Sequence, residues 1–390
     1  MSPSAVPLSL YIHIPWCVKK CPYCDFNSYT QHGALPVDDY VAALLTDLDR
    51  DLREHAAAVA GRSLHSVFFG GGTPSLFAPT AIARILDGVA ARIGLPASAE
   101  ITLETNPGTI EHGRFEGYLA AGVNRISFGV QSFDDDKLRR LGRIHSAAEA
   151  EAAVRAAHDA GVANINLDLM YALPEQSLAG ALADVGRAIA LAPRHISHYQ
   201  LTLEPGTLFA VRPPKVPDED AAWDMQEACQ QALAAAGYAQ YEVSAYARDG
   251  RQCEHNLNYW RFGDYLGIGA GAHGKLGEPA SGRSVRTSKY KLPRSYLQHA
   301  ANGEALGSSS AIATRELPFE FMLNALRLNA GVPRALFAQR TGLDDTAIAA
   351  TLQRAHARGW LADDPARIAA SETGRRFLND VIELFLPDRP

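Results

Sequence analysis

The chain has 390 residues, of which 47% are hydrophobic and 21% charged, and its formal net charge at pH 7 is −6. This balance is typical of a globular protein with a sizeable core, predicts two or three domains and excludes a disordered chain. The acidic charge gives no overall field that would attract nucleic acid or an anionic membrane surface, so we expect no nucleic-acid partner.

The first residues, MSPSAVPLSL, have neither the basic start nor the apolar run of a signal peptide. No later run of about 18 apolar residues predicts a transmembrane helix. Clustered cysteines suit a reducing compartment, where thiols stay free to bind metal. We therefore expect a cytoplasmic protein with no integral membrane segment.

Short apolar runs alternate with helical segments over the first 205 residues. The runs LYIHI, SVFFGGG, EITLETN, RISFGVQ, INLDLMY and HISHYQLTL predict six strands, which begin near Leu10, Ser66, Glu100, Arg125, Ile165 and His195. Strands separated by amphipathic helices form parallel β/α units. Six units predict an α/β fold, an open (β/α)6 partial TIM barrel whose active face lies where the carboxyl ends of the strands meet the loops.

The helices between these strands carry start and stop signals. After Pro36, apolar residues recur at helical spacing, and Gly61 is the expected stop. Ser146 and Glu149 predict a capping box that opens a helix running to Gly161.

The loop after the first strand contains Cys17, Cys21 and Cys24 in the sequence HIPWCVKKCPYCDFNS. Structural zinc sites and ordinary iron–sulfur clusters are closed by four protein ligands, and neither Cys229 nor Cys253 is near enough in sequence to be an obvious fourth. Three thiolates therefore predict a 4Fe–4S cluster with one iron open to a small molecule. A zinc site and a redox-active thiol loop are the alternatives.

Polar residues follow or interrupt the predicted strands on the expected active face. The loop GGGTP follows the second strand, and its glycines allow a ligand to approach the backbone, although a tight turn explains them equally well. Glu104, Gln131 and Asp168 lie where apolar side chains are the default. Buried, they must pair with a ligand, with Arg143 or with one another in a structural network.

The pattern changes near Pro205, where the sequence becomes rich in proline. We expect a partial barrel over residues 1–205, a linker with the HNLNYW and glycine-rich sequences over 206–310, and a C-terminal domain over 311–390. This last domain is mostly helical and resembles a small winged-helix module. DNA binding is not expected of it, because its presumed recognition helix opens with two aspartates.

Together these sequences resemble a known family. YIHIPWCVKKCPYCDFNS, FFGGGTPS, ITLETNPG, RISFGVQSF, LGRIHS and INLDLMYALPEQ are similar to the coproporphyrinogen III oxidase-like branch of the radical S-adenosylmethionine (SAM) superfamily, over nearly the whole chain. The resemblance implies that Cys17, Cys21 and Cys24 ligate a 4Fe–4S cluster whose open iron binds SAM. It implies a SAM site lined by Tyr11, Tyr23, Gly71, Gly72, Thr73, Glu104, Gln131, Arg143 and Asp168.

Two departures separate the chain from the coproporphyrinogen III dehydrogenases of this branch. Those enzymes carry a fourth cysteine two residues after the third, and a long N-terminal extension over the active site. This chain has Phe26 at the cysteine's position and begins only 16 residues before Cys17. The two departures disfavour oxidative decarboxylation of coproporphyrinogen, which stays the alternative function.

The segment HNLNYW has instead the HNxxYW motif of the HemW-type heme chaperones, so the resemblance implies a heme site at His255, Asn256, Tyr259 and Trp260. Imidazole is the commonest axial ligand of heme iron, and aromatic side chains offer a flat apolar wall. His273, in the glycine-rich GDYLGIGAGAHG, is a second candidate ligand, with a structural role as its alternative. The sequence CEH is not the CxxCH of covalent heme attachment.

The sequence thus predicts a cytoplasmic heme chaperone that binds heme, a 4Fe–4S cluster and SAM. It would transfer heme to an acceptor protein, as a monomer or homodimer, with an electron donor as a further partner. The alternative is an oxygen-independent coproporphyrinogen III dehydrogenase of porphyrin biosynthesis, in which a 5′-deoxyadenosyl radical abstracts hydrogen from the propionates. A radical SAM enzyme acting on RNA is disfavoured by the net charge.

Overall fold

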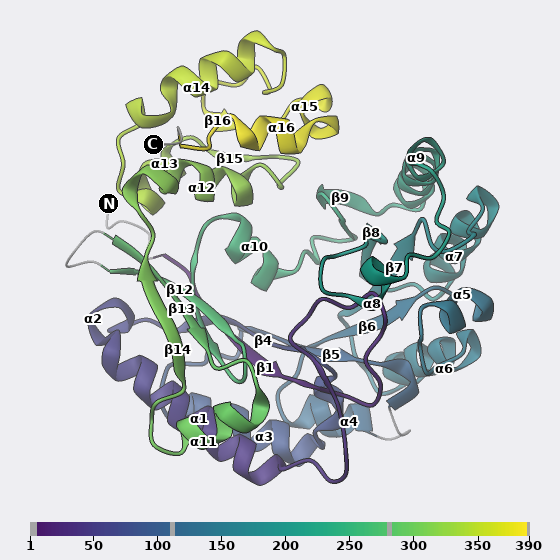
Figure 1. Ribbon diagram of the computed structural model, residues 1–390, viewed down its shortest axis with the longest axis vertical. Coiled ribbons are helices and arrows are strands. Elements are labelled where there is room, and N and C mark those ends of the chain that lie inside the picture. Colours follow the sequence, from purple (N-terminus) through teal and green to yellow (C-terminus); the bar gives the residue numbers. More distant parts are fainter. Residues whose placement is uncertain (1–5, 110–113, 279–282, 388–390) are drawn as a thin grey trace.

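The computed structural model describes residues 6–109, 114–278 and 283–387 (Figure 1). Six parallel strands form the centre of its large sheet, each beside the next in chain order. The predicted open (β/α)6 partial barrel is therefore confirmed. The six strands are β1 (Leu8–Ile14), β4 (Leu64–Gly71), β5 (Glu100–Thr105), β6 (Arg125–Gln131), β7 (Ile165–Tyr171) and β8 (His195–Gln200).

Helices cover the outer face of these strands (Figure 1). The capping box predicted at Ser146 and Glu149 is confirmed. The helical run predicted to stop at Gly61 is divided in two: the first helix ends at Glu54, a short second one ends at Val59, and Gly61 follows with φ of +69°. These helices are α1 (Val37–Glu54), α2 (Ala56–Val59), α3 (Pro79–Ala90), α4 (Arg114–Ala120), α5 (Asp135–Arg140), α6 (Ala147–Asp159) and α7 (Leu178–Ala190), with 3-10 turns at Pro74–Leu76 and Pro107–Thr109.

Further strands extend the sheet at both edges. At the β8 edge, β10 (Ala245–Ala247) and β9 (Ala239–Glu242) add in antiparallel order. At the other edge, β11 (Asp264–Ile268) is parallel to β1, and β12 (His273–Glu278), β13 (Arg283–Lys289) and β14 (Leu306–Ala311) follow antiparallel. Strands β12 to β14 were not predicted, because glycine, serine and charged residues dominate them and hide the alternation that marks a half-buried strand.

Four helices accompany these added strands: α8 (Leu208–Val211), α9 (Glu219–Ala235), α10 (Glu254–Trp260) and α11 (Pro293–Ala300). Helix α10, which carries the HNxxYW sequence, packs against β4 and β1. It lies on the face of the sheet opposite to α1 and α3 (Figure 1). The segment 206–310 therefore builds both edges of the sheet and covers part of its inner face.

A second hydrophobic core holds the C-terminal part together, with Phe321, Phe337 and Val381 at its centre. Phe262, just after α10, contacts Phe321 with ring centroids 5.7 Å apart, which joins this core to the barrel. No helix in the described ranges has the length and apolar character needed to cross a membrane. The elements are a 3-10 turn (Thr314–Glu316), α12 (Leu317–Ala325), β15 (Val332–Pro333), α13 (Ala335–Thr341), α14 (Thr346–Ala357), β16 (Arg367–Ile368), α15 (Glu372–Arg376) and α16 (Leu378–Glu383).

A buried ion cluster ties the added strands to the first helix. The Lys289 Nζ atom, at the end of β13, lies 2.6 Å from an Asp47 oxygen and 2.7 Å from an Asp51 oxygen on α1. The Tyr296 hydroxyl donates to the other Asp47 oxygen at 2.9 Å. These charged side chains are at most 2% exposed, so removing one partner leaves the others charged in a site without water.

We predict that Lys289→Met lowers the free energy of unfolding by about 3–5 kcal/mol, since both carboxylates lose their cation. Chemical denaturation of the variant measures this loss. Lys291→Met is the matched control, because its side chain is exposed and its loss should change stability by no more than about 0.5 kcal/mol. Equal effects of the two substitutions would show that the cluster contributes no stability of its own.

Candidate cluster and ligand site

The cysteine loop is closed at its base by a short pair of strands, β2 (Trp16–Cys17) and β3 (Tyr29–Thr30). The amide of Tyr29 donates to the Pro15 carbonyl, and that of Gln31 to the Cys17 carbonyl, each at 2.8 Å. Across the loop, the Lys20 ammonium donates to two of its carbonyl oxygens at 3.0 and 3.1 Å. The loop is therefore held by hydrogen bonds of its own backbone and of the Lys20 side chain.

Cys17, Cys21 and Cys24 are free, half-buried and line one cavity of about 360 Å³, here called the cluster cavity. Burial raises the pKa of the Cys17 thiol, whereas binding to iron deprotonates a thiol. The Arg143 guanidinium donates to the Cys21 sulfur at 3.6 Å, a contact that strengthens when the sulfur is a thiolate. A cationic donor beside three open thiols fits a 4Fe–4S cluster.

No three His, Cys, Asp or Glu side chains in the described ranges converge on a single metal ion. A zinc ion would need such convergence. A four-iron cluster does not, because each thiolate binds a different iron atom. The arrangement of the described residues is therefore compatible with a four-iron cluster.

The structure brings eight of the nine residues predicted for SAM to the cluster cavity. Tyr11 is the exception, because it lines a neighbouring cavity and its hydroxyl lies 3.0 Å from Nδ1 of His13. The eight residues are Tyr23, Gly71, Gly72, Thr73, Glu104, Gln131, Arg143 and Asp168.

The glycines of GGGTP are required by close packing against the cysteine loop. Gly71 has φ of +112°, and a Cβ there would lie 2.4 Å from the His13 ring. A Cβ on Gly72 would lie 2.5 Å from the Trp16 carbonyl oxygen. The Gly71 amide donates to Glu104 at 3.2 Å. This close packing explains the glycines as a tight turn, and a ligand site at the same loop stays a prediction.

Two buried carboxyl groups face the cluster cavity. Burial, with the nearby charge of Asp168, raises the pKa of Glu104 to about 8. Burial raises the pKa of Asp168 too, although hydrogen bonds from Asn166, at 2.8 Å, and Ser127, at 3.2 Å, oppose the shift. A cationic group bound between Glu104 and Asp168 would favour their ionised forms, so the pair is suited to a ligand's ammonium.

Gln131 reaches the cavity from the irregular end of β6, and Arg143 reaches it from the loop after α5. Gln131 has φ of +70°, at a break in the pairing of β6 with β7. Its side-chain oxygen accepts from the Tyr199 hydroxyl at 2.9 Å. Arg143 donates to the Gly129 carbonyl at 2.5 Å, while its Nε has no partner among the described residues.

Sequence reasoning missed several cavity residues on the last strands. Ser197 and Tyr199 alternate along β8, and Met170 follows Asp168 on β7 by the same two-residue step. This inward alternation was the signal that could have found them. Glu204 had no such signal, because it lies beyond β8.

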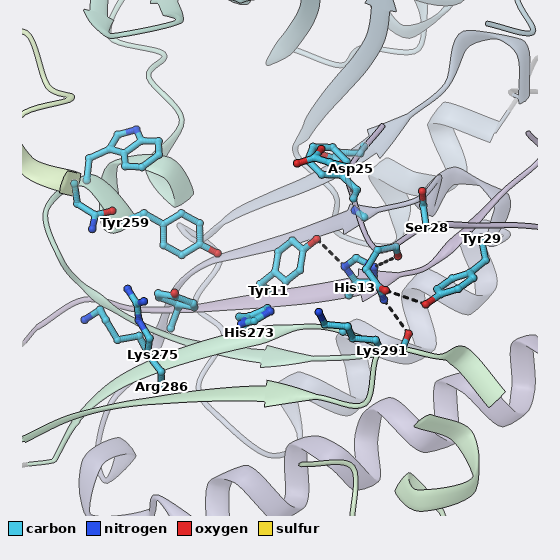
Figure 2. A pocket seen from close by; sticks show the side chains of 18 of the residues that line it. Tyr11, His13, Asp25, Ser28, Tyr29, Tyr259, His273, Lys275, Arg286 and Lys291 are labelled. Atoms are coloured by element: carbon cyan, nitrogen blue, oxygen red, sulfur yellow. Dashed lines mark hydrogen bonds between the residues drawn. The ribbon is translucent and has the colours of Figure 1, made fainter. Parts of the chain in front are cut away.

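A second and larger cavity, of about 780 Å³, adjoins the first and shares Gly71 and Glu104 with it. Figure 2 shows side chains that line this larger cavity. Aromatic side chains form one part of its wall and basic side chains another. We call it the aromatic cavity. Its lining includes Tyr11, Tyr259, Trp260, Phe262, Tyr265, Lys20, His273, Lys275, Arg286 and Lys291.

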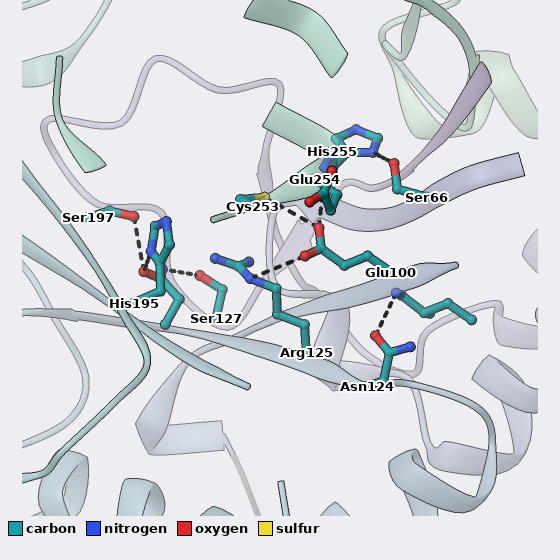
Figure 3. A network of polar contacts seen from close by, with 12 residues as sticks. Ser66, Glu100, Asn124, Arg125, Ser127, His195, Ser197, Cys253, Glu254 and His255 are labelled. Carbon is teal, nitrogen blue, oxygen red and sulfur yellow. Dashed lines mark hydrogen bonds and ion pairs between the residues drawn. The ribbon is translucent and has the colours of Figure 1, made fainter. Parts of the chain in front are cut away.

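Of the residues predicted for heme, Tyr259 and Trp260 line the aromatic cavity, whereas His255 and Asn256 do not. His255 is 1% exposed, and its Nδ1 lies 2.9 Å from the Ser66 hydroxyl (Figure 3). Its Nε2 lies 2.8 Å from the Tyr259 hydroxyl. Burial lowers the pKa of His255 to about 3, so the ring is neutral.

The hydrogen bonds define the tautomer of His255. The Ser66 hydroxyl donates to Ser9 at 2.8 Å, so its oxygen accepts from Nδ1–H of His255. The lone pair on Nε2 therefore accepts from Tyr259. An iron bound to His255 would have to displace that tyrosine hydroxyl.

Residues 11–183 match the model of the radical SAM superfamily, and residues 312–377 match that of the HemN C-terminal domain. The heme chaperone HemW of Haemophilus influenzae is 52% identical over 386 residues, covering 99% of this chain and 100% of that protein. The heme chaperone HemW of Escherichia coli is 53% identical, covering 98% and 99%. The solved coproporphyrinogen III oxidase (HemN) of Escherichia coli superposes with a TM-score of 0.81 at 25% identity, covering 97% and 90%.

We predict that replacing Cys17, Cys21 or Cys24 by Ala abolishes the brown absorption and the bound iron of the reconstituted protein, because two thiolates are too few ligands. Iron and sulfide analysis measures the loss. Cys229→Ala and Cys253→Ala are the controls, since both thiols are buried away from this loop. Loss of iron in either control would contradict the assigned ligand set.

We predict that Glu104→Ala and Asp168→Ala each weaken SAM binding by about 1–3 kcal/mol, because each removes a buried partner of the ligand. Equilibrium binding of SAM to the reconstituted variants measures this, with cluster absorption as the check on integrity. Asp184→Ala is a matched control, because Asp184 is also buried but lies outside the cavity. Unchanged SAM affinity in both test variants would show that Glu104 and Asp168 have a structural role and do not bind SAM.

Proposed function

Because the chain belongs to the family of the HemW heme chaperones, within the radical SAM superfamily, we propose that it binds heme and delivers it to an acceptor protein. Cys17, Cys21 and Cys24 hold a 4Fe–4S cluster in this proposal, with SAM beside it in the cluster cavity. When bound, the cluster supplies an iron with an open position for SAM. The five free cysteines suit the reducing cytoplasm, where we place the protein.

The observation that carries the proposal is the aromatic cavity beside the cluster cavity. Its volume of about 780 Å³ lies in the range of cofactor sites. Tyr259 packs edge-on against Tyr265, with ring centroids 4.5 Å apart, and lies next to Trp260. Such a wall suits a flat macrocycle, and the basic side chains suit its carboxylates.

Within the HNxxYW motif, the geometry favours different roles for its members. Tyr259 and Trp260 contact heme in this proposal. His255 holds the Tyr259 ring through the hydrogen bond at Nε2. The axial role predicted for His255 would break that bond, so we assign the imidazole to positioning the tyrosine.

The second candidate, oxidative decarboxylation of coproporphyrinogen, draws on the likeness to the solved coproporphyrinogen III oxidase. Against it stands Phe26, which replaces the expected fourth cysteine. Its side chain is 60% exposed at the border shared by the two cavities. A phenyl ring there contributes apolar surface and no thiol chemistry, which favours a carrier.

We predict that the anaerobically reconstituted protein binds heme with a defined Soret band and passes it to an apo-protein acceptor, without producing carbon dioxide from coproporphyrinogen III. Parallel absorption and decarboxylation assays test both outcomes. Trp260→Ala should weaken heme binding by about 1.5–3 kcal/mol through lost apolar contact. Trp223→Ala is the matched control, because Trp223 lies outside both cavities. Robust decarboxylation would reverse the order of the two candidates.

A further inference from the structure

Strands β11, β12 and β13 place a row of side chains on the wall of the aromatic cavity (Figure 2). His273 and Lys275 are two residues apart on β12 and therefore share one face of the sheet. Arg286 of β13 pairs directly with Lys275, as does Tyr265 of β11 from the other side. Directly paired residues of antiparallel strands point to the same face, so the four side chains form one continuous surface.

This row places two cations directly opposite each other, an arrangement that destabilises a sheet. Lys275 is 5% exposed, and its pKa is lowered to about 8 by burial. Its one carboxylate partner, Asp264, lies 3.7 Å away and is shared with Arg62 at 2.8 Å. Arg286 pairs with Glu320, at 2.5 Å, and remains 44% exposed. The Lys275 ammonium also donates to the Phe262 carbonyl at 3.3 Å and lies 4.1 Å from the centroid of the Phe262 ring. Its single, shared carboxylate leaves room for an anionic partner from a ligand, which would favour the charged form of Lys275.

His273 differs from the other imidazoles near the cavity. The His13 ring is bound at both nitrogens, by Tyr11 and by the Asn27 carbonyl, and His255 is bound at both of its own. His273 is exposed on the cavity wall, and no hydrogen bond to its ring occurs among the described residues. Burial, then the charge of Lys291, lowers its pKa. A neutral ring with a free lone pair is the form that binds heme iron.

Resting on the proposed function, we propose that heme binds in the aromatic cavity with its iron on His273 and its two propionates on Lys275 and Arg286. Residues two apart on a strand are separated by about 7 Å. That separation is comparable with the distance from the centre of a porphyrin to the carboxylates at its edge. Tyr265 lies in the same row and supplies the apolar contact beside the macrocycle.

The first experiment tests the axial ligand by absorption spectroscopy of the heme complex. His273→Ala should move the Soret and visible bands to those of heme without an imidazole ligand, and added free imidazole should restore them. His255→Ala should leave the band positions unchanged, even if it weakens binding through Tyr259. Unchanged bands in His273→Ala, or the loss of the imidazole signature in His255→Ala alone, would overturn the assignment.

The second experiment compares heme with its dimethyl ester, in which neither propionate is charged. Two charge-assisted contacts, each worth about tenfold, predict that the wild type prefers heme by about a hundredfold. Arg286→Gln and Lys275→Met should each reduce this preference by about tenfold, while Arg294→Gln, an exposed charge outside the cavity, should retain it. Because Lys275 is buried, the Lys275→Met variant can fail to fold; the result for Arg286→Gln then tests the propionate contacts by itself.

Different results would overturn heme carriage and the assigned propionate contacts. If the wild type shows no heme spectrum at all, the proposal of heme carriage is wrong, and so is the assignment of His273, Lys275 and Arg286 as heme ligands. If the wild type binds heme but does not distinguish the ester, or if Arg286→Gln keeps the full preference, heme carriage stands and the propionate site is overturned.

Discussion

One side chain, Asn27, connects the cysteine loop to the wall of the aromatic cavity. Its amide nitrogen donates to the Ala270 and Lys291 carbonyls, each at 2.9 Å, and its side-chain oxygen accepts from the Tyr29 hydroxyl. Its backbone carbonyl contacts the His13 ring. The glycine turn beside it fits only because Gly271 has no Cβ, which would lie 2.3 Å from the Asn27 amide nitrogen. Asn27 therefore joins the cysteine loop to the turn that precedes His273 and Lys275 on β12.

The inner face of the barrel also carries charged side chains at the amino ends of its strands, and helix α10 supplies a partner for them. Arg125 is 2% exposed, and its Nε lies 3.9 Å from Glu100 (Figure 3). Glu100 accepts from the backbone amide of His255 at 3.2 Å. A buried charge needs such partners, so α10 is held by charges at the start of two barrel strands. That anchorage directs the next turn of the helix, with Tyr259 and Trp260, to the aromatic cavity.

The two cavities are formed by different parts of the fold. The cluster cavity is built at the carboxyl ends of parallel strands, where Glu104, Gln131 and Asp168 meet the cysteine loop. The aromatic cavity is built between α10 and the antiparallel strands added at the β1 edge. Glu104 and Gly71 line both cavities, so the two cavities adjoin at these residues.

The sequence by itself determined the six barrel strands and the place of the cysteine loop, because alternating hydrophobicity and short-range spacing are local properties. It also marked Glu104 and Asp168, since a carboxylate inside an apolar run stands out. Only the tertiary structure shows that the His255 ring is buried and hydrogen-bonded, because its partner Ser66 lies 189 residues away in the sequence. It alone decided that Arg286 stands opposite Lys275, because strand register depends on pairing between segments whose polar sequences predict no strand.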